Sequence, residues 1–232
     1  MPTAIVTGAS RGFGFALASA LVAHGWSLVV DARDAHALHE AVNSLGTTAR
    51  VTPIAGDVTD SAHQRRLVSA AEGLGGLDLV VHNASELGPS PQPPLATYPP
   101  ATLRRVYEVN VVAPLALTQT AAALLGRSEA PTVVMLSSDA AVEAYEGWGG
   151  YGSSKAALDQ VAAVLAAEQP WWRVYAFDPG DMNTAMHQAA FPGEDISDRA
   201  DPASVVPRLL QLLDRRPASG RYRAADLAAV LA

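Results

Sequence analysis

The residues Thr3-Ala-Ile-Val-Thr7-Gly8-Ala-Ser-Arg-Gly12-Phe-Gly14 lie at the start of the chain and decide its fold. The first of them are apolar or β-branched and predict a short strand, and an apolar helix follows the glycines. Glycine in such a turn lets the backbone approach a pyrophosphate, toward which the first N–H groups of the helix point. Any strand-to-helix turn can use glycine, so this segment predicts a dinucleotide site only together with other motifs.

A second motif, Tyr151-Gly-Ser-Ser-Lys155, places a phenol and an ammonium group four residues apart. On a helix these residues share a face, so Lys155 can lie close to Tyr151. A neighbouring positive charge favours the phenolate, and we therefore expect Lys155 to lower the pKa of Tyr151. A tyrosine of this kind can donate or accept a proton near neutral pH. Chance pairing on a surface helix is the alternative interpretation of such a short motif.

A serine stands thirteen residues before that tyrosine, at the end of an apolar run. The run Val133-Val-Met-Leu136 predicts a buried strand that delivers Ser138 at its carboxyl end. In an open α/β sheet, this end of the strands is where ligands bind. The three segments together indicate an active site.

With these motifs, nearly the whole chain resembles the short-chain dehydrogenase/reductase family. Members carry T-G-x-x-x-G-x-G, N-N-A-G, a serine before Y-x-x-x-K, and P-G after the sixth strand. The matching segments here are Thr7 to Gly14, His82-Asn83-Ala84-Ser85, Ser138, Tyr151 with Lys155, and Pro179-Gly180. His82 and Ser85 replace the outer residues of N-N-A-G, so the turn can differ locally there.

The resemblance implies one doubly wound, Rossmann-like α/β domain over residues 1–232, with a parallel seven-stranded sheet and helices on both faces. It implies a nicotinamide-dependent carbonyl reductase or alcohol dehydrogenase acting on a small ketone, aldehyde or secondary alcohol. Ser138 would bind the carbonyl oxygen and Tyr151 would donate the proton. Lys155 would bind the ribose and stabilise the phenolate, and Asn110 would organise a water path to Lys155. Residues 184–201 would form a substrate lid.

Positions matching the family's cofactor contacts occur in every motif. They are Gly8, Ser10, Arg11, Gly12, Phe13, Gly14, Asp31, Arg33, Asp57, Val58, Asn83, Ala84, Ser85, Tyr151, Lys155, Pro179, Gly180, Met182 and Thr184. Substrate contacts are expected from Ser138, Tyr145, Trp148, Tyr151 and Met186.

The end of the second strand bears on the choice between the two nicotinamide cofactors. An acidic residue there favours NAD(H), because it binds the ribose 2′-hydroxyl and repels a phosphate. Asp31 is a candidate, but the usual acidic position falls on Ala32, and Arg33 follows where phosphate-preferring members place a base. Arg11 is a second base of this kind. We expect NADP(H), with NAD(H) as the alternative, and Asp31 turned away or paired to an arginine.

Composition and charge exclude several classes of protein. A net charge of −7 offers no broad basic field, so nucleic acid is not an expected partner. The chain has no cysteine, which excludes disulfides and thiolate metal sites, and its scattered histidines imply no metal. It begins without a secretion signal, and no run approaches the roughly 18 apolar residues of a membrane span, so we expect a cytoplasmic protein and no membrane partner.

Two helical segments, 101–126 and 152–168, are rich in alanine and leucine around much of their circumference. A helix that is apolar all round is usually buried. The family associates through these two helices, so we expect a homodimer or homotetramer.

Two other functions are compatible with the fold. One is a regulatory protein that binds the dinucleotide without turnover, although it would have no need of Ser138, Tyr151 and Lys155 together. The other is an epimerase or dehydratase, for which Glu143 or Glu146 could supply an extra acid or base.

Overall fold

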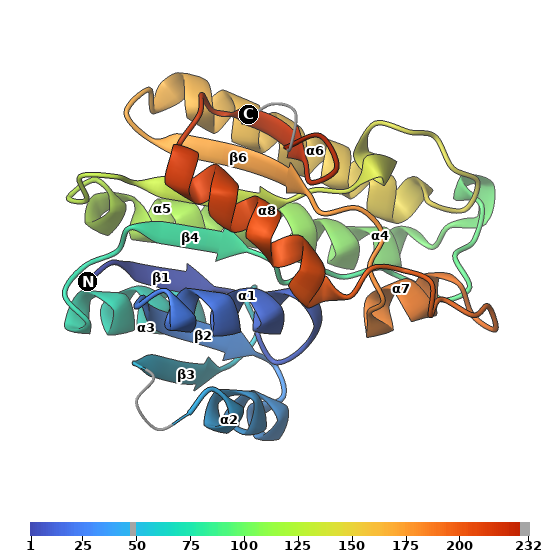
Figure 1. Cartoon of the computed structure of the whole chain (residues 1–232). Coiled ribbons are helices and arrows are strands. Elements are labelled where there is room, and N and C mark those ends of the chain that lie inside the picture. The colour runs from blue at the N-terminus through green and yellow to red at the C-terminus, as the bar shows by residue number, and fades with distance from the viewer. Residues whose placement is uncertain (47–49, 228–232) are drawn as a thin grey trace.

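The strands of the protein form one parallel sheet (Figure 1). The computed structural model describes residues 1–46 and 50–227, so residues 47–49 and 228–232 of the predicted domain lie outside it. The sheet has seven strands in the order β3-β2-β1-β4-β5-β6-β7, which confirms the predicted doubly wound α/β fold. Their bounds are β1 Thr3–Val6, β2 Ser27–Ala32, β3 Val51–Ala55, β4 Leu79–His82, β5 Thr132–Leu136, β6 Arg173–Asp178 and β7 Gly220–Arg223.

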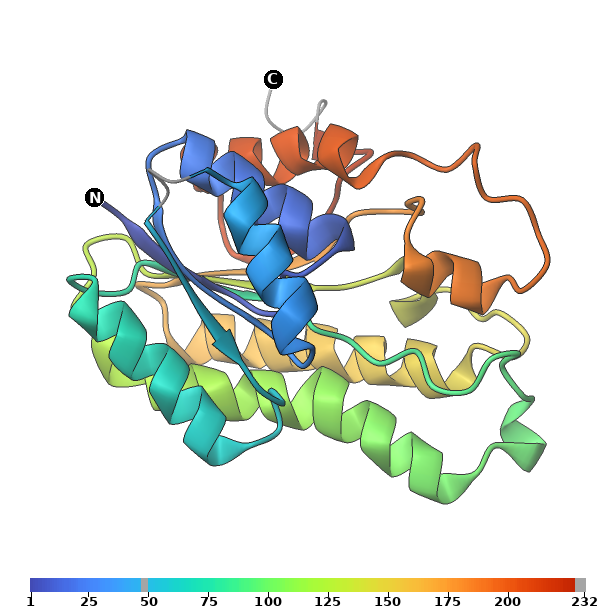
Figure 2. The ribbon, with the colours of Figure 1, turned by 90° about the horizontal axis from the view of Figure 1, so that it is seen from below.

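Helices cover both faces of the sheet (Figure 2). One face carries α1 (Gly12–Ala23), α2 (Ala35–Ser44) and α8 (Pro202–Arg215), and the other carries α3 (Ser61–Gly73), α5 (Ala113–Leu125) and α6 (Gly149–Glu168). The central strands β1, β4 and β5 are buried along their whole length. This double coverage explains why they appear as continuous apolar runs rather than alternating ones.

Three helices begin with an aspartate N-cap, whereas α1, which follows the glycine-rich turn, does not. The side chains of Asp34, Asp60 and Asp201 cap α2, α3 and α8 by accepting backbone N–H groups of the first turn. At the start of α1, by contrast, Arg11 makes no side-chain hydrogen bond to the helix. The first N–H groups of α1 therefore lack a side-chain cap at the position where the glycine-rich turn would hold a pyrophosphate.

A π-helical turn interrupts the long helix behind the site. The turn η2 (Glu108–Val112) joins α4 (Pro100–Tyr107) to α5 and contains Asn110. Pro114 has no N–H for the carbonyl of Asn110, so the α-helical hydrogen bonding breaks there. By length and composition the whole run Pro100–Leu125 could cross a membrane, contrary to the expectation from the sequence, but half of its apolar window is buried in the fold.

The short elements gather beyond the carboxyl ends of the strands. They are η1 (Leu95–Thr97), η3 (Asp139–Ala141) and α7 (Ala185–Ala190), and Figure 1 shows α7 beyond the arrowheads. The predicted lid, 184–201, begins with α7 and continues mostly without regular structure to α8. The predicted motifs lie at this edge of the sheet, because each of the strands β1, β4, β5 and β6 is followed directly by one of them.

Candidate active site

The loop after β4 holds the glycine-rich turn in place. The Nδ2 atom of Asn83 donates to the carbonyls of Thr7 (2.8 Å) and Gly8 (3.0 Å). The hydroxyl of Thr7 accepts the N–H groups of Asn83 and Ala84, both at 3.0 Å. A Cβ atom at Gly14 would overlap the amide of Asn83. The predicted contact residues that follow β1 and β4 therefore lie together, and only glycine fits at position 14 against Asn83.

Asp31 lies beneath this turn and not on its cofactor side. Its Oδ1 atom accepts the N–H of Gly8 at 2.8 Å, and its Oδ2 atom lies 2.9 Å from Nε2 of His63. Both side chains are fully buried. Burial raises the pKa of Asp31, while the hydrogen bonds from His63 and Gly8 oppose that rise. Of the two alternatives predicted with NADP(H), the structure shows Asp31 turned away and bound to His63, not to an arginine. The prediction of Asp31 as a ribose contact is wrong, because the buried carboxylate supports the turn from inside, with a histidine that the sequence did not single out.

The other predicted residues near the turn divide into exposed and buried side chains. Arg11 and Arg33 are exposed, and Arg33 lies 3.7 Å from Glu86. Ser10 is partly exposed in the turn itself. The ring of Phe13 stacks on Phe177 in the core at 6.1 Å between centroids. Phe13 can therefore reach a cofactor only through its backbone N–H, and its contact with the cofactor stays a prediction.

Asp57 and Val58 follow β3 as predicted, but their polar groups bind neighbouring residues. Asp57 accepts the N–H and hydroxyl of Thr59 and forms an ion pair with Arg105 at 2.7 Å. Burial alone would raise the pKa of Asp57, but the hydrogen bonds from Thr59 and Arg105 prevail and hold it at about 2. The carbonyl of Val58 accepts Nε2 of Gln64 at 2.7 Å. These contacts fix the loop on which an adenine ring is expected.

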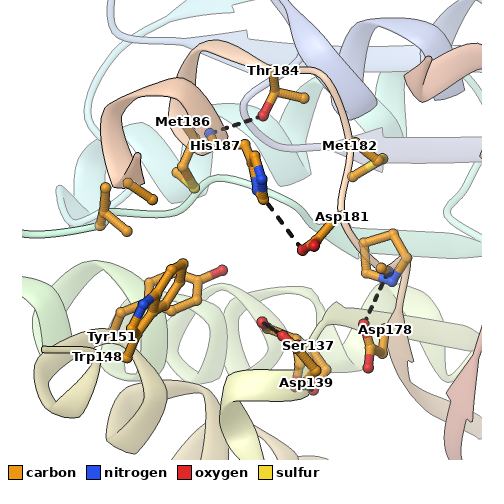
Figure 3. A pocket seen from close by; sticks show the side chains of 15 residues that line it. Ser137, Asp139, Trp148, Tyr151, Asp178, Asp181, Met182, Thr184, Met186 and His187 are labelled. Carbon is orange, nitrogen blue, oxygen red and sulfur yellow. Dashed lines mark hydrogen bonds and ion pairs between the residues drawn. The ribbon is translucent and has the colours of Figure 1, made fainter. Parts of the chain in front are cut away.

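Ser138, Tyr151 and Lys155 come together at the carboxyl edge of the sheet. Ser138 and Tyr151 line one cavity of about 110 Å³. Figure 3 shows Tyr151 among the side chains of its wall. Lys155 is buried behind it, where Nζ donates to the carbonyl of Leu136 at 2.7 Å and lies 5.4 Å from the centroid of the Tyr151 ring. The helix α6 carries both residues of the Y-x-x-x-K motif on the face that packs on β5 and η3.

The protonation of these groups differs from the expectation. Burial raises the pKa of Tyr151, and hydrogen bonds with Ser85 and Ser138 only partly oppose this effect. Burial also lowers the pKa of Lys155 to about 8, although the nearby carboxylate of Asp159 favours its charged form. The expected net lowering of the pKa of Tyr151 is wrong for this arrangement, because desolvation of the phenolate outweighs the effect of neighbouring groups that favour it. Tyr151 therefore keeps its proton at neutral pH, as a proton donor must.

Asn110 connects the loop after β4 to α6. Its Nδ2 atom donates to the carbonyl of Glu86 and to the hydroxyl of Ser154, both at 2.9 Å. Its Oδ1 atom accepts the N–H of Glu86 and the hydroxyl of Ser85. Ser85, a departure from the family motif, thus lies between Asn110 and Tyr151. A water path from Asn110 to Lys155 stays a prediction.

The other departure, His82, points away from the cofactor turn. Its Nε2 atom lies 2.8 Å from the hydroxyl of Thr118 on α5, and the side chain is buried. Burial lowers its pKa to about 3, so the ring is neutral at physiological pH. Successive residues of a strand face opposite sides of the sheet. The histidine that replaces the first asparagine of N-N-A-G therefore changes the core and not the cofactor turn.

The cavity wall contains both predicted and unexpected residues. Among the predicted ones it includes Trp148, Pro179, Gly180, Met182, Thr184 and Met186, and among the others Ser137, Asp139, Asp178, Asp181 and His187. Tyr145 is not among the lining residues: it is half exposed and donates to Asp139 at 3.0 Å. Asp139 and Asp181 directly follow Ser138 and Gly180, so adjacency to a motif was the available signal for these acids.

The last strand reaches into the site through Arg221. Its Nη2 atom donates to the carbonyl of Ser138 at 2.9 Å and to Asp178 at 2.8 Å, and its Nε atom donates to Asp159 at 3.0 Å. Asp178 in turn accepts the N–H of Gly180. This guanidinium therefore ties β5, β6 and α6 together beneath the cavity, a role for which the sequence offered no signal.

Comparison with known proteins agrees with this geometry. The family model for short chain dehydrogenases matches residues 2–195. Sepiapterin reductase from Meriones unguiculatus is 37% identical over 202 residues, which cover 80% of this chain and 76% of that protein. The uncharacterized oxidoreductase YciK of Escherichia coli (strain K12) is 32% identical over 215 residues, covering 90% and 84%.

A solved short chain dehydrogenase from Shigella flexneri 2a strain 301, complexed with NADP, has a TM-score of 0.90 at 30% identity and covers 97% of both chains. The fold, the grouping of Ser138, Tyr151 and Lys155 and these similarities lead to one conclusion: the chain belongs to the short-chain dehydrogenase/reductase family of oxidoreductases.

Proposed function

We propose that the protein is an NADP(H)-dependent carbonyl reductase, or alcohol dehydrogenase in reverse, acting on a small ketone, aldehyde or secondary alcohol. The observation that carries the proposal is Tyr151 beside Ser138 on one cavity wall, with Nζ of Lys155 behind it at 5.4 Å from the centroid of the Tyr151 ring. Glu143 and Glu146 are exposed and are not among the residues that line the cavity, so epimerisation or dehydration gains no support.

The glycine-rich turn fits a dinucleotide. The N-terminus of α1 has no side-chain cap, and Gly12 adopts a left-handed φ of 58°. A Cβ atom on Gly12 would lie 3.6 Å from Thr184, so the turn and the segment after β6 flank the same space. The N–H groups of α1 would hold the pyrophosphate, and Thr184 and Lys155 would hold the nicotinamide half. When bound, the cofactor supplies the hydride.

The residues of the chain handle the proton and the oxygen. Ser138 now donates to Asp139 at 2.9 Å, and its hydroxyl would turn to the substrate carbonyl. Tyr151 gives its proton to that oxygen, and the charge of Lys155 stabilises the phenolate that remains. Hydrogen bonds that strengthen as the oxygen gains negative charge lower the barrier. Asn110 would support the return of a proton to Tyr151.

The preference for NADP(H) rests on the side chains around the adenosine ribose. Asp31 is withdrawn beneath the turn, and Arg33 and Arg11 are exposed beside it. Guanidinium groups form charge-assisted, bidentate contacts with a phosphate that a hydroxyl cannot replace. The Shigella flexneri relative was crystallised with NADP.

Association between copies of the chain is part of the proposal. Val112 and Leu115 at the start of α5 and Val164 on α6 are large apolar side chains that are 37 to 45% exposed. Burial of these residues against a second copy would remove them from water, as expected for a homodimer or homotetramer.

The test of the proposed activity is a panel of ketones and aldehydes mixed with the protein and NADPH. Loss of the absorbance of the reduced cofactor is followed for the parent and for Tyr151→Phe. Reduction by the parent and not by the variant supports the proposal. A parent that binds NADPH but oxidises it with no member of a broad panel would contradict it.

A further inference from the structure

The ionisable side chains on the cavity wall are unbalanced in charge. Asp139, Asp178 and Asp181 line the cavity, whereas the lining set within the described part of the chain contains no lysine or arginine. Asp178 is neutralised by Arg221 at 2.8 Å. Asp181 is approached by Arg199 at 3.8 Å, but that arginine forms its shorter ion pair, 2.8 Å, with Asp198. Negative charge therefore prevails among the side chains that line the cavity, while the positive charge of Lys155 lies behind Tyr151, outside the lining.

His187 adds an unused hydrogen-bonding atom to this wall. Its side chain is 90% buried, and within residues 1–46 and 50–227 its Nε2 atom has no hydrogen-bond partner. Its Nδ1 atom faces Asp181 at 3.8 Å (Figure 3). The carboxylate favours the proton on Nδ1, which leaves Nε2 as an acceptor. Buried polar atoms are nearly always paired in proteins, so this atom indicates a ligand that donates to it.

An aromatic surface completes the cavity. The indole ring of Trp148 packs against Tyr151 at 5.9 Å and against Phe191 at 5.7 Å between centroids. Aromatic faces attract cations through their quadrupole. The wall thus combines two acceptors, Asp181 and His187, with rings that also favour positive charge.

We propose that the substrate is a carbonyl compound bearing a nitrogen group that donates hydrogen bonds, in its protonated form, to Asp181 and His187. This inference rests on the proposed carbonyl reduction. Asp139 already accepts from Ser138, Ala140 and Tyr145, so it contributes charge, while Asp181 is 56% exposed and has acceptor capacity left. Asp139 and Asp181 line the same cavity as Tyr151 and oppose the negative charge that forms on the reacting oxygen, and a cationic substrate offsets that opposition.

The experiment uses three matched ketones: 4-(aminomethyl)acetophenone, 4-ethylacetophenone and 4-acetylbenzoate, which are cationic, neutral and anionic. Calorimetry measures their binding to the protein saturated with NADP⁺, where no hydride is available, and kcat/KM is then measured with NADPH. The cation should bind best and the anion worst. In Asp181→Asn the ratio of cation to anion affinity should fall about tenfold, as for loss of a close charge pair. His187→Phe keeps a ring against Phe191 and should also weaken the binding of the cationic ketone.

Glu194→Gln is the matched control, because Glu194 is an exposed acid of the same segment that is not among the lining residues. The ratio of cation to anion affinity in Glu194→Gln should equal that of the parent. Equal or tighter binding of the neutral or anionic ketone by the parent overturns the inference, and so does an unchanged ratio in Asp181→Asn. If all three ketones are reduced without preference, only this inference fails. If the binding order holds but none is reduced, the cavity's preference for cations is supported and the proposed function fails.

Discussion

The Oδ2 atom of Asp31 lies 2.9 Å from the Nε2 atom of His63, and both side chains are completely buried under the glycine-rich turn. The acid within β2 is thus bound to His63 and to the N–H of Gly8. It cannot accept a hydrogen bond from a ribose hydroxyl without breaking these contacts. In the proposed binding of NADP(H), the exposed Arg33 and Arg11 would supply the positive charge for a 2′-phosphate.

Replacing Arg33 should therefore change the cofactor preference. The parent is expected to have a higher kcat/KM with NADPH than with NADH, and in Arg33→Ala this ratio should fall about tenfold, equivalent to ~1.4 kcal/mol. Arg127→Ala is a suitable control, because Arg127 is an exposed arginine before β5, at the opposite edge of the sheet. An NADH-preferring parent would refute the assignment.

Tyr151→Phe should remove the proton donor and leave the rest of the site in place. We expect kcat for carbonyl reduction to fall by about 10²- to 10⁴-fold, the range for loss of a general acid. NADPH affinity and the unfolding temperature should stay near the parental values, because only a hydroxyl is lost. A reduction rate within a few-fold of the parent would exclude Tyr151 as the donor.

The segment 184–201 should exchange its amide hydrogens faster than the central sheet when no ligand is bound. It joins α7 to α8 with few regular hydrogen bonds, and Phe191 packs on Trp148 across the cavity. Hydrogen exchange detected by mass spectrometry can compare it with 133–137, with and without NADPH. Equal protection in both segments and no change on adding cofactor would exclude a lid.

Light scattering should give a mass for the protein that is two or four times the 24.1 kDa of one chain. Val164→Glu places a charge on the exposed apolar face of α6 and should shift the mass toward that of the monomer. A monomeric parent at micromolar concentration would contradict association through this face.

His82 should make the fold sensitive to acid. Its pKa is lowered from the ordinary value of 6.5 to about 3, so below pH 6.5 the unfolded chain binds a proton that the folded chain does not. The contribution of the neutral, buried His82 to the free energy of unfolding is fully present above pH 6.5. It decreases as the pH falls toward 3, by about 1.4 kcal/mol per pH unit for one proton. Urea unfolding between pH 7 and pH 5 should show a shallower loss for His82→Asn. Parallel pH profiles for parent and variant would show that His82 has no part in it.

The sequence predicted the fold correctly, and the structure brings Ser138, Tyr151 and Lys155 to one edge of the sheet, because the signals for both lie in short stretches of the chain. Alternating strands and helices determine a parallel sheet, and the spacing from Ser138 to Lys155 lies within one strand, one loop and one helix. The partner of Asp31 was not predicted, because His63 comes from a different crossover and approaches only after the sheet has formed. The pKa of Tyr151 was wrong for a similar reason: helical spacing shows the neighbouring charge but not the burial.

The cavity wall was predicted least well. Adjacency to a motif identifies a loop but not the direction of each side chain. Tyr145 was expected inside and lies outside, bound to Asp139, whereas Asp181 and His187 line the cavity. Such orientations depend on turns and on the packing of α7, which a sequence pattern does not specify.

The guanidinium of Arg221 has a consequence for the order in which the molecule assembles during synthesis. The glycine turn and its braces, up to Ser85, are all made before any catalytic residue leaves the ribosome. Ser138, Asp159 and Asp178 are joined through a residue that is translated dozens of positions later than any of them. A growing chain can thus fold the part that carries the glycine-rich turn while the part that carries Ser138 and Tyr151 still lacks the hydrogen bonds of Arg221. The hydrogen bonds that join β5, β6 and α6 beneath the cavity form only after β7 has been synthesised.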